Sequence, residues 1–197
     1  MRYHMMFLVV VALLGFSACG APETPAFSGT GAVVPIDENA PVIPPELSGT
    51  ALAAADYTII DPTVRKALTN AGQDFKIHVR SGMYVFPASV LVEHFQEVRV
   101  DTNDIVYGDL TGDGIPDALV KVTVGTGELS TTELAAFTAS GGTAHQFAAF
   151  PLGHAEVKSV DITNGKIRVN FVHTVVGDPG SRNTQLMLEL PKNKIEL

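Results

Sequence analysis

Oxygen-bearing side chains stand at alternate positions as Asp109, Thr111, Asp113 and Asp117, with Ile115 the one apolar residue in this alternation. Glycine occupies the sixth position counted from Asp109, as Gly114. Calcium is a hard cation with several oxygen ligands, and a chain curling around it supplies them at alternate residues, with glycine where the turn is sharpest. The spacing therefore predicts a calcium loop. Its expected ligands are Asp109, Thr111, Asp113, the Ile115 carbonyl and Asp117.

A competing interpretation is that Asp109, Asp113 and Asp117 are ordinary turn residues, because Asp-Gly pairs are common in turns. The alternate-residue spacing favours the calcium site, since a turn alone does not require it. Asp101 and Asp104, just upstream, are expected to be solvated loop residues; the alternative is that they add negative charge to the site.

The segment Gly108 to Asp117, which reads GDLTGDGIPD, resembles the loops of FG-GAP and VCBS repeats and, less closely, those of dockerins. The chain also resembles small exported bacterial proteins of uncharacterised function that carry a single GDLNGDG-type loop. Propeller repeats recur at a regular period, whereas this pattern occurs once. An EF-hand is disfavoured because Val120 stands where that motif needs a bidentate glutamate. The resemblance implies a calcium-clamped loop between two strands of a β-rich domain, with no activity attached.

The first 18 residues resemble a bacterial lipoprotein signal peptide. A basic start at Arg2 precedes an apolar run over residues 5–14 and small residues before Cys19, the only cysteine of the chain. That run is too short for a transmembrane helix, which needs about 20 apolar residues. Phe16 stands where lipoprotein signals usually have Leu, Val or Ile. The alternative is an ordinary secretory signal cut near Ala18, with Cys19 an incidental thiol.

Lipidation of Cys19 would attach the protein to a membrane through a diacylglycerol group and a palmitate-type acyl chain. We therefore expect a cell-envelope protein, at the outer membrane or facing the periplasm if the host has two membranes. The formal net charge of −8 and the lack of a basic run exclude nucleic acid as an expected partner, because phosphate backbones would be repelled.

Residues 19–55 are expected to form a tether, because they hold half of the prolines and only acidic charges. A short edge strand at residues 33–36 or 41–43 is the alternative. Residues 56–197 are then a single domain. A helix is predicted over residues 61–71, with Asp61 as its cap and Gly72 at its end.

Most other segments have the alternation and β-branched composition of strands. Strands are predicted over residues 75–79, 89–100, 117–124, 133–138, 144–150, 157–163, 166–173 and 185–190. The apolar run over residues 117–124 predicts a strand buried on both faces. Asn164-Gly165 and the glycine-rich segment 139–143 predict hairpins. The expected fold is mainly β, an antiparallel meander or sandwich with one short helix, although an α+β fold is also compatible.

Catalytic patterns are weak. His154-Ala155-Glu156 matches the H-x-E of zinc deaminases, but their Pro-Cys-x-x-Cys partner needs two cysteines. The other histidines after the signal show no ligand spacing, and Ser181 pairs only loosely with His173. These other histidines are His78, His94, His145 and His173.

We therefore expect a non-catalytic binding or structural domain that is stabilised by calcium, with an envelope protein or a glycan as its partner. Two alternatives remain. One is an envelope enzyme whose site is assembled from dispersed His and Asp residues, which would show a pocket lined by histidines. The other is a calcium-dependent adhesion or carbohydrate-binding module, for which Tyr107 is the candidate aromatic beside the loop.

Overall fold

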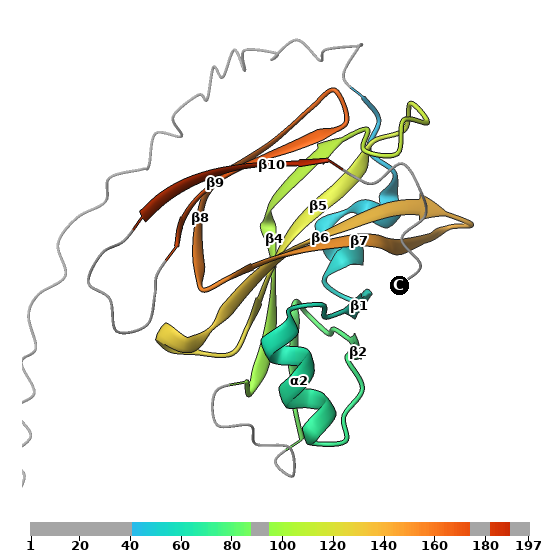
Figure 1. Ribbon diagram of the computed structural model, residues 1–197. Helices are drawn as coiled ribbons and strands as arrows, with labels where there is room; N and C mark the ends of the chain where they lie inside the picture. Colours follow the sequence, from blue (N-terminus) through green and yellow to red (C-terminus); the bar gives the residue numbers. More distant parts are fainter. Residues whose placement is uncertain (1–40, 88–94, 174–181, 190–197) are drawn as a thin grey trace, which may run out of the picture. The chain divides into compact units, whose positions relative to one another are not determined.

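The computed structural model describes residues 41–87, 95–173 and 182–189 (Figure 1). In chain order the elements are η1 (Pro45–Leu47), α1 (Gly49–Leu52), β1 (Asp56–Thr58), α2 (Pro62–Asn70), β2 (Lys76–His78), β3 (Met83–Val85), β4 (Glu97–Gly108), β5 (Asp117–Val124), η3 (Gly127–Leu129), β6 (Thr131–Ser140), β7 (Thr143–Gly153), β8 (Ala155–Thr163), β9 (Lys166–His173) and β10 (Arg182–Glu189).

The strands form antiparallel sheets in which neighbours in space are mostly neighbours in sequence. Strands β3 to β7 make a five-stranded meander in chain order, and β8 to β10 make a three-stranded one. A two-stranded sheet pairs β1 with β2. The prediction of a mainly β, antiparallel protein is confirmed.

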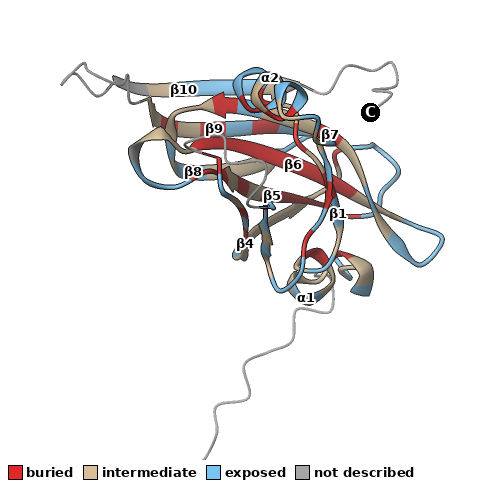
Figure 2. Ribbon diagram, turned by 90° about the horizontal axis from the view of Figure 1, so that it is seen from below, coloured by how far each residue is buried: buried red, intermediate tan, exposed pale blue. Residues whose placement is uncertain are grey.

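The five-stranded sheet is the middle layer between two apolar cores. Alternate residues of β5 and β6 point to opposite faces, as the pleat of a strand requires. One face, with Val120 and Phe137, packs in a cluster with α1, α2 and the two-stranded sheet. The other face, with Leu119 and Leu134, packs against β9 and its neighbours. Figure 2 shows the resulting concentration of buried residues along β5 and β6.

Local sequence signals account for the helix and the hairpins. The Asp61 carboxylate accepts hydrogen bonds from the backbone amides of Thr63 and Val64, which caps α2 as predicted. The turn between β8 and β9 is Asn164-Gly165, with φ of 53° and 71°. Positive φ at both central residues matches the twist of the flanking strands, which explains why this pair forms the turn.

Two features of the fold differ from the sequence prediction at the N-terminal side. Leu47 and Leu52, within the predicted tether, are fully buried in the core, so the packed domain begins no later than Pro45. Residues 41–43 form no strand, although Ile43 packs against the core. The short elements α1, β1 and β3 were not predicted, because three or four residues hold too little periodic pattern. The alternative strand at residues 33–36 lies outside the described residues.

The bounds of β4 also differ from those of the predicted strand over residues 89–100. The strand runs to Gly108, so Asp101 and Asp104 lie within a strand and are not the loop residues that the sequence predicted. The register of β4 with β5 shifts between Asp101 and Val106. Because a bulge adds unpaired residues to one strand, the apolar and polar residues of β4 do not alternate regularly along the sequence. Of the predicted strand over residues 89–100, residues 89–94 lie outside the described part of the chain.

Gly108 sets how closely the two larger sheets approach. A β-carbon added to Gly108 would lie 2.6 Å from Cγ2 of Ile162 in β8. Real β-carbons do not approach other atoms so closely, so glycine is the residue that lets β8 pack against the end of β4. The loop that follows Gly108 is thereby fixed beside the turn between β8 and β9.

Candidate functional site

The predicted calcium loop connects β4 to β5 and is the yellow-green loop at the top of Figure 1. A β-carbon added to Gly165, in the turn between β8 and β9, would lie 3.6 Å from the carbonyl oxygen of Asp109. The loop therefore lies at the end of the middle sheet, against a turn of the three-stranded sheet. It joins a partly exposed strand end to β5, which is buried on both faces as predicted.

The loop backbone folds around the carboxylate of Asp109. Its Oδ1 accepts a hydrogen bond from the Gly112 amide at 2.6 Å, and its Oδ2 accepts one from the Gly114 amide at 2.9 Å. Gly112 and Gly114 have φ of 80° and 84°, a conformation that other residues adopt at a cost. The glycines allow the turn that brings these amides to Asp109.

Asp117 closes the loop from its other end. This residue is fully buried, and its Oδ2 accepts hydrogen bonds from the amides of Leu110 and Thr111 at 2.9 and 2.8 Å. Its Oδ1 is also buried and has no hydrogen-bond partner. A buried carboxylate oxygen without a partner is costly, and such an atom in a native protein requires an explanation such as an ion or a water molecule.

The middle of the loop is exposed. Asp113 Oδ1 accepts a hydrogen bond from the Ile115 amide at 2.8 Å, which is the local turn contact typical of aspartate. Thr111 is exposed, and the Ile115 side chain retains 48% of its accessible surface.

The structure brings Asp109 and Asp117 to the two ends of one turn, with Asp113 at its exposed edge. No group of three or more His, Cys, Asp or Glu residues is arranged to hold a metal in the described ranges. The oxygens that this loop offers to calcium are the Oδ1 of Asp117, further lone pairs of Asp109 and Asp113, the Thr111 hydroxyl and the Ile115 carbonyl. Calcium accepts such mixed sets of carboxylate, hydroxyl and carbonyl ligands.

Asp101 forms an ion pair outside the loop. Its Oδ2 lies 2.9 Å from the Lys121 ammonium on the neighbouring strand. This hydrogen bond lowers the pKa of Asp101, against a smaller opposing effect of burial. Asp101 therefore belongs to an ion pair across β4 and β5 and not to the loop.

The histidines are dispersed. Nδ1 of His78 lies 2.7 Å from the exposed carboxylate of Asp56, and Nδ1 of His154 lies 2.9 Å from the Ser130 carbonyl. His145 contacts the Thr143 hydroxyl at a hairpin end. His94 and Ser181 lie outside the described residues. Two cavities among the described residues, one between β5 and β8 and one beside α2, have linings without a histidine.

Tyr107 is not an open aromatic platform. Its hydroxyl donates a hydrogen bond to the Leu47 carbonyl at 2.9 Å, and its ring packs against the core that holds the helices. Partial burial raises the pKa of this phenol. The tyrosine therefore ties η1 to β4, which leaves less of its face for a sugar ring.

Glu133 is a chemically distinctive residue that the sequence motifs did not indicate. Glu133 in β6 is 1% exposed, and its Oε2 accepts hydrogen bonds from the amides of Ile60 and Asp61 at 3.1 Å each. Its Oε1 is buried without a partner. Burial raises the pKa of Glu133 to about 7. The sequence signal was an acidic residue at an inward position of a strand, in alternation with Ala135 and Phe137.

Comparisons of the chain with protein-family models, curated proteins and solved structures found no match. No helix in the described part of the chain is long and apolar enough to span a membrane. Cys19 and the predicted signal peptide lie outside the described residues.

Proposed function

We propose that this is a lipid-anchored cell-envelope protein whose β domain is stabilised by calcium and serves a binding or structural role without catalysis. The apolar run over residues 5–14 and the small residues before Cys19 support the anchor. The geometry of the loop between β4 and β5 supports the calcium site. An envelope protein or a glycan is the expected class of partner.

The observation that carries the calcium proposal is the buried, unpartnered Oδ1 of Asp117. The other oxygen of this carboxylate already accepts two backbone amides, so its orientation is fixed. A cation at Oδ1 would compensate the charge that burial leaves without a partner. Asp117 would supply the buried ligand, and Asp109, Thr111, Asp113 and the Ile115 carbonyl would supply the ligands toward solvent.

Calcium bound only by the folded state should raise the melting temperature. Extracellular calcium sites typically have Kd of about 10⁻⁴–10⁻³ M, so about 2 mM calcium would add roughly 0.7–1.8 kcal/mol to the free energy of unfolding. This stabilisation corresponds to a rise of a few degrees in the melting temperature. Magnesium should substitute poorly, because it demands tight octahedral geometry and releases its waters reluctantly.

The experiment is a thermal scan of the full chain in EDTA, calcium and magnesium. Asp109→Ala and Asp113→Ala should abolish the gain from calcium, whereas the matched variant Asp101→Ala should retain it, because Asp101 pairs with Lys121. If Asp109 is only a turn residue, Asp109→Ala will lower the melting temperature equally in EDTA and in calcium. Identical curves of the unaltered chain in all three buffers would disprove the site.

The anchor is tested separately. Cys19→Ala should release the protein from the membrane fraction or leave an uncleaved precursor, because stable attachment requires several buried acyl chains on one residue. Unchanged partitioning of a processed protein would exclude lipidation of Cys19 and leave the calcium proposal standing.

A further inference from the structure

The carboxyl group of Glu133 lies where the segment that precedes α2 meets β6. Its Oε2 accepts hydrogen bonds from the amides of Ile60 and Asp61, whereas its Oε1 is buried without a partner. Thr131 lies two residues earlier in β6, so its side chain is on the same face of the strand. Its hydroxyl is also buried without a partner. One oxygen of the Glu133 carboxylate is therefore compensated by backbone amides, and the other is not.

The charged residue that acts on Glu133 is Asp61, which is 3% exposed and whose carboxylate caps α2. Two like charges in a buried site disfavour each other's ionised form. On the neighbouring strands β5 and β7 the residues paired with Glu133 are Val122 and Pro151, which carry no charge. No basic side chain acts on Glu133 among the described residues, so the ionised carboxylate has no counter-ion there.

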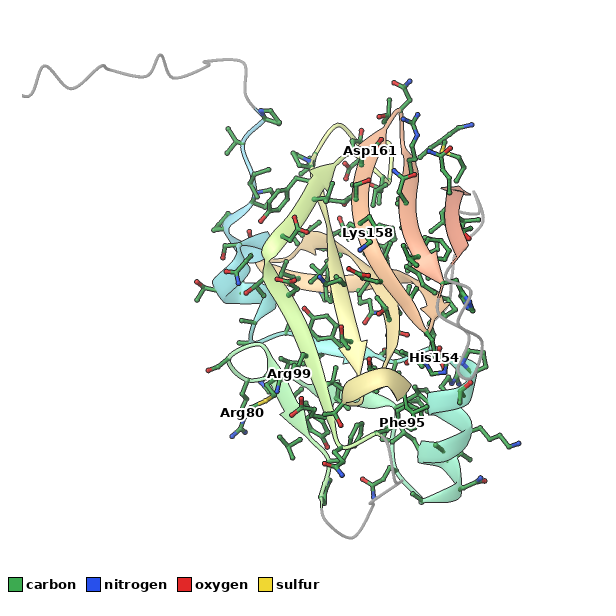
Figure 3. All side chains as sticks on the ribbon, turned by 90° about the vertical axis from the view of Figure 1, so that its left-hand side faces the viewer. Arg80, Phe95, Arg99, His154, Lys158 and Asp161 are labelled. Atoms are coloured by element: carbon green, nitrogen blue, oxygen red, sulfur yellow. The ribbon has the colours of Figure 1, made fainter. Side chains whose placement is uncertain are left out.

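The other titratable and charged side chains of the elements around this site are exposed or have partners elsewhere. They are Asp56 and His78, which pair with each other, and Tyr57, Arg65, Lys66, Lys76, Asp117, Lys121, His145 and His154. His154 lies at the end of the middle sheet where η3 leads into β6 (Figure 3), and its Nδ1 donates a hydrogen bond to the Ser130 carbonyl. At this site, Glu133 is therefore the group whose ionisation leaves a buried charge without compensation.

Helix α2 is held to the domain by few side chains. Of its nine residues, only Val64 and Leu68 are buried, whereas most residues of β5 and β6 are buried. Segments with few buried apolar side chains open at a lower free energy than the core does. The two hydrogen bonds of Glu133 hold the backbone immediately before the first turn of α2. An opening of α2 from this end therefore breaks both bonds and brings the carboxyl group of Glu133 into water.

We propose that Glu133 is a pH-sensitive contact that controls a local opening of α2. With its carboxyl group protonated, the segment that begins α2 is held against β6. Loss of the proton favours a state in which residues 60–70 leave the middle sheet while β5 and β6 stay folded, because the opening hydrates a charge that is uncompensated in the closed state. Burial raises the pKa of Glu133 to about 7, so the change falls near neutral pH. The proposal depends on neither the calcium loop nor the lipid anchor.

The test is amide hydrogen exchange of the full chain in EDTA, followed by NMR between about pH 5 and pH 8 and corrected for the intrinsic exchange rate. The opening constant of the α2 amides should rise about 70-fold over this range, because the open state restores the ordinary pKa of 4.5 to Glu133. The amides of β5 should be more strongly protected than those of α2 at every pH, because their exchange requires global unfolding. Glu133→Gln keeps an acceptor for both amides and should make the opening of α2 independent of pH.

Two further variants distinguish this role from a merely structural contact. Asp61→Asn keeps the cap of α2, because asparagine caps a helix as well as aspartate does, but it removes the charge that helps to raise the pKa of Glu133. The pH at which the opening of α2 stops increasing should therefore move downward. The matched control is His154→Gln, because histidines also titrate near neutral pH. Glutamine keeps a donor for the Ser130 carbonyl, and this variant should have the pH profile of the unaltered chain.

Three results would overturn the proposal. Equal protection of α2 and β5 at every pH would show that α2 opens only when the whole domain unfolds. Exchange of α2 that does not change with pH in the unaltered chain would show that no proton controls the opening. A pH dependence that survives Glu133→Gln, or that disappears in His154→Gln, would assign the proton to another residue.

Discussion

Glu133 in β6 accepts a hydrogen bond at 3.1 Å from the backbone amide of Asp61, the residue that caps α2. The same carboxylate oxygen accepts a second bond from the amide of Ile60. One buried acid thus fixes the start of α2 against the middle sheet, across a sequence separation of 72 residues. The cost is a carboxylate held away from water, with the charge of Asp61 nearby.

This burial predicts stability that depends on pH. The pKa of Glu133 rises from the ordinary 4.5 to about 7 in the folded state, so the folded state binds the proton more tightly than the unfolded state. Its contribution is therefore fully present below about pH 4.5 and is lost as pH rises through about 7. The difference amounts to about 3 kcal/mol.

Glu133→Gln should remove this dependence, because glutamine keeps an acceptor for both amides and does not titrate. In urea unfolding with EDTA, the free energy of unfolding of the variant relative to the unaltered chain should rise by about 3 kcal/mol between about pH 4.5 and pH 8. The control is Glu156→Gln, at an exposed position. Its free energy of unfolding relative to the unaltered chain should not change with pH. A flat difference for Glu133→Gln as well would show that Glu133 does not titrate in this range.

Gln146 in β7 should stabilise the edge of β1. Its side-chain amide accepts from the Thr58 amide at 2.7 Å and donates to the Thr58 carbonyl at 3.1 Å. Gln146→Ala should lower the free energy of unfolding by about 2 kcal/mol, since each bond contributes about 1 kcal/mol. Gln185→Ala, which removes an exposed bond to Asn170, should cost under about 0.5 kcal/mol in the same chemical denaturation experiment. Equal costs would contradict the prediction.

Gly108 and Ile162 should be energetically coupled. Gly108→Ala places a β-carbon against Cγ2 of Ile162 and should cost about 1–3 kcal/mol through overpacking. Ile162→Ala removes Cγ2 but keeps the β-carbon of residue 162, which lies 2.8 Å from the added one. It should therefore relieve part of the overpacking, and the double variant should be more stable than the sum of the two single costs predicts. A double-mutant cycle measures this coupling. Additive costs would mean that the two sheets adjust freely at this contact.

Asp117 should be required for calcium binding, whereas a residue that only stabilises the turn would not be. Asp117→Asn retains an oxygen for the amides of Leu110 and Thr111 but removes the charge at the buried position. Calcium titration by calorimetry should show binding lost in this variant, and its melting temperature should be the same in calcium and EDTA. Asp104→Asn, in β4, should bind calcium like the unaltered chain. Calcium binding that persists in Asp117→Asn would remove Asp117 from the ligand set.

Much of the fold follows from residues that are close together in the sequence. The helix at Pro62–Asn70 and the turn at Asn164-Gly165 depend on a capping carboxylate and on positive φ, and both are properties of two or three consecutive residues. The buried strand Asp117–Val124 follows from its apolar composition. The loop from Asp109 to Asp117 is likewise local, since its carboxylates bond amides at most seven positions away.

The tertiary structure decided which distant residues meet. Whether Glu133 faces a core or solvent depends on the register of β6, and its contact with Asp61 depends on where α2 packs. Val157 and Val160, three positions apart in β8, both pack against the second apolar cluster because the register with β9 shifts between Val157 and Ser159. Register, bulges and layer packing arise from long-range pairing of chain segments, so their consequences for a site are absent from local sequence patterns.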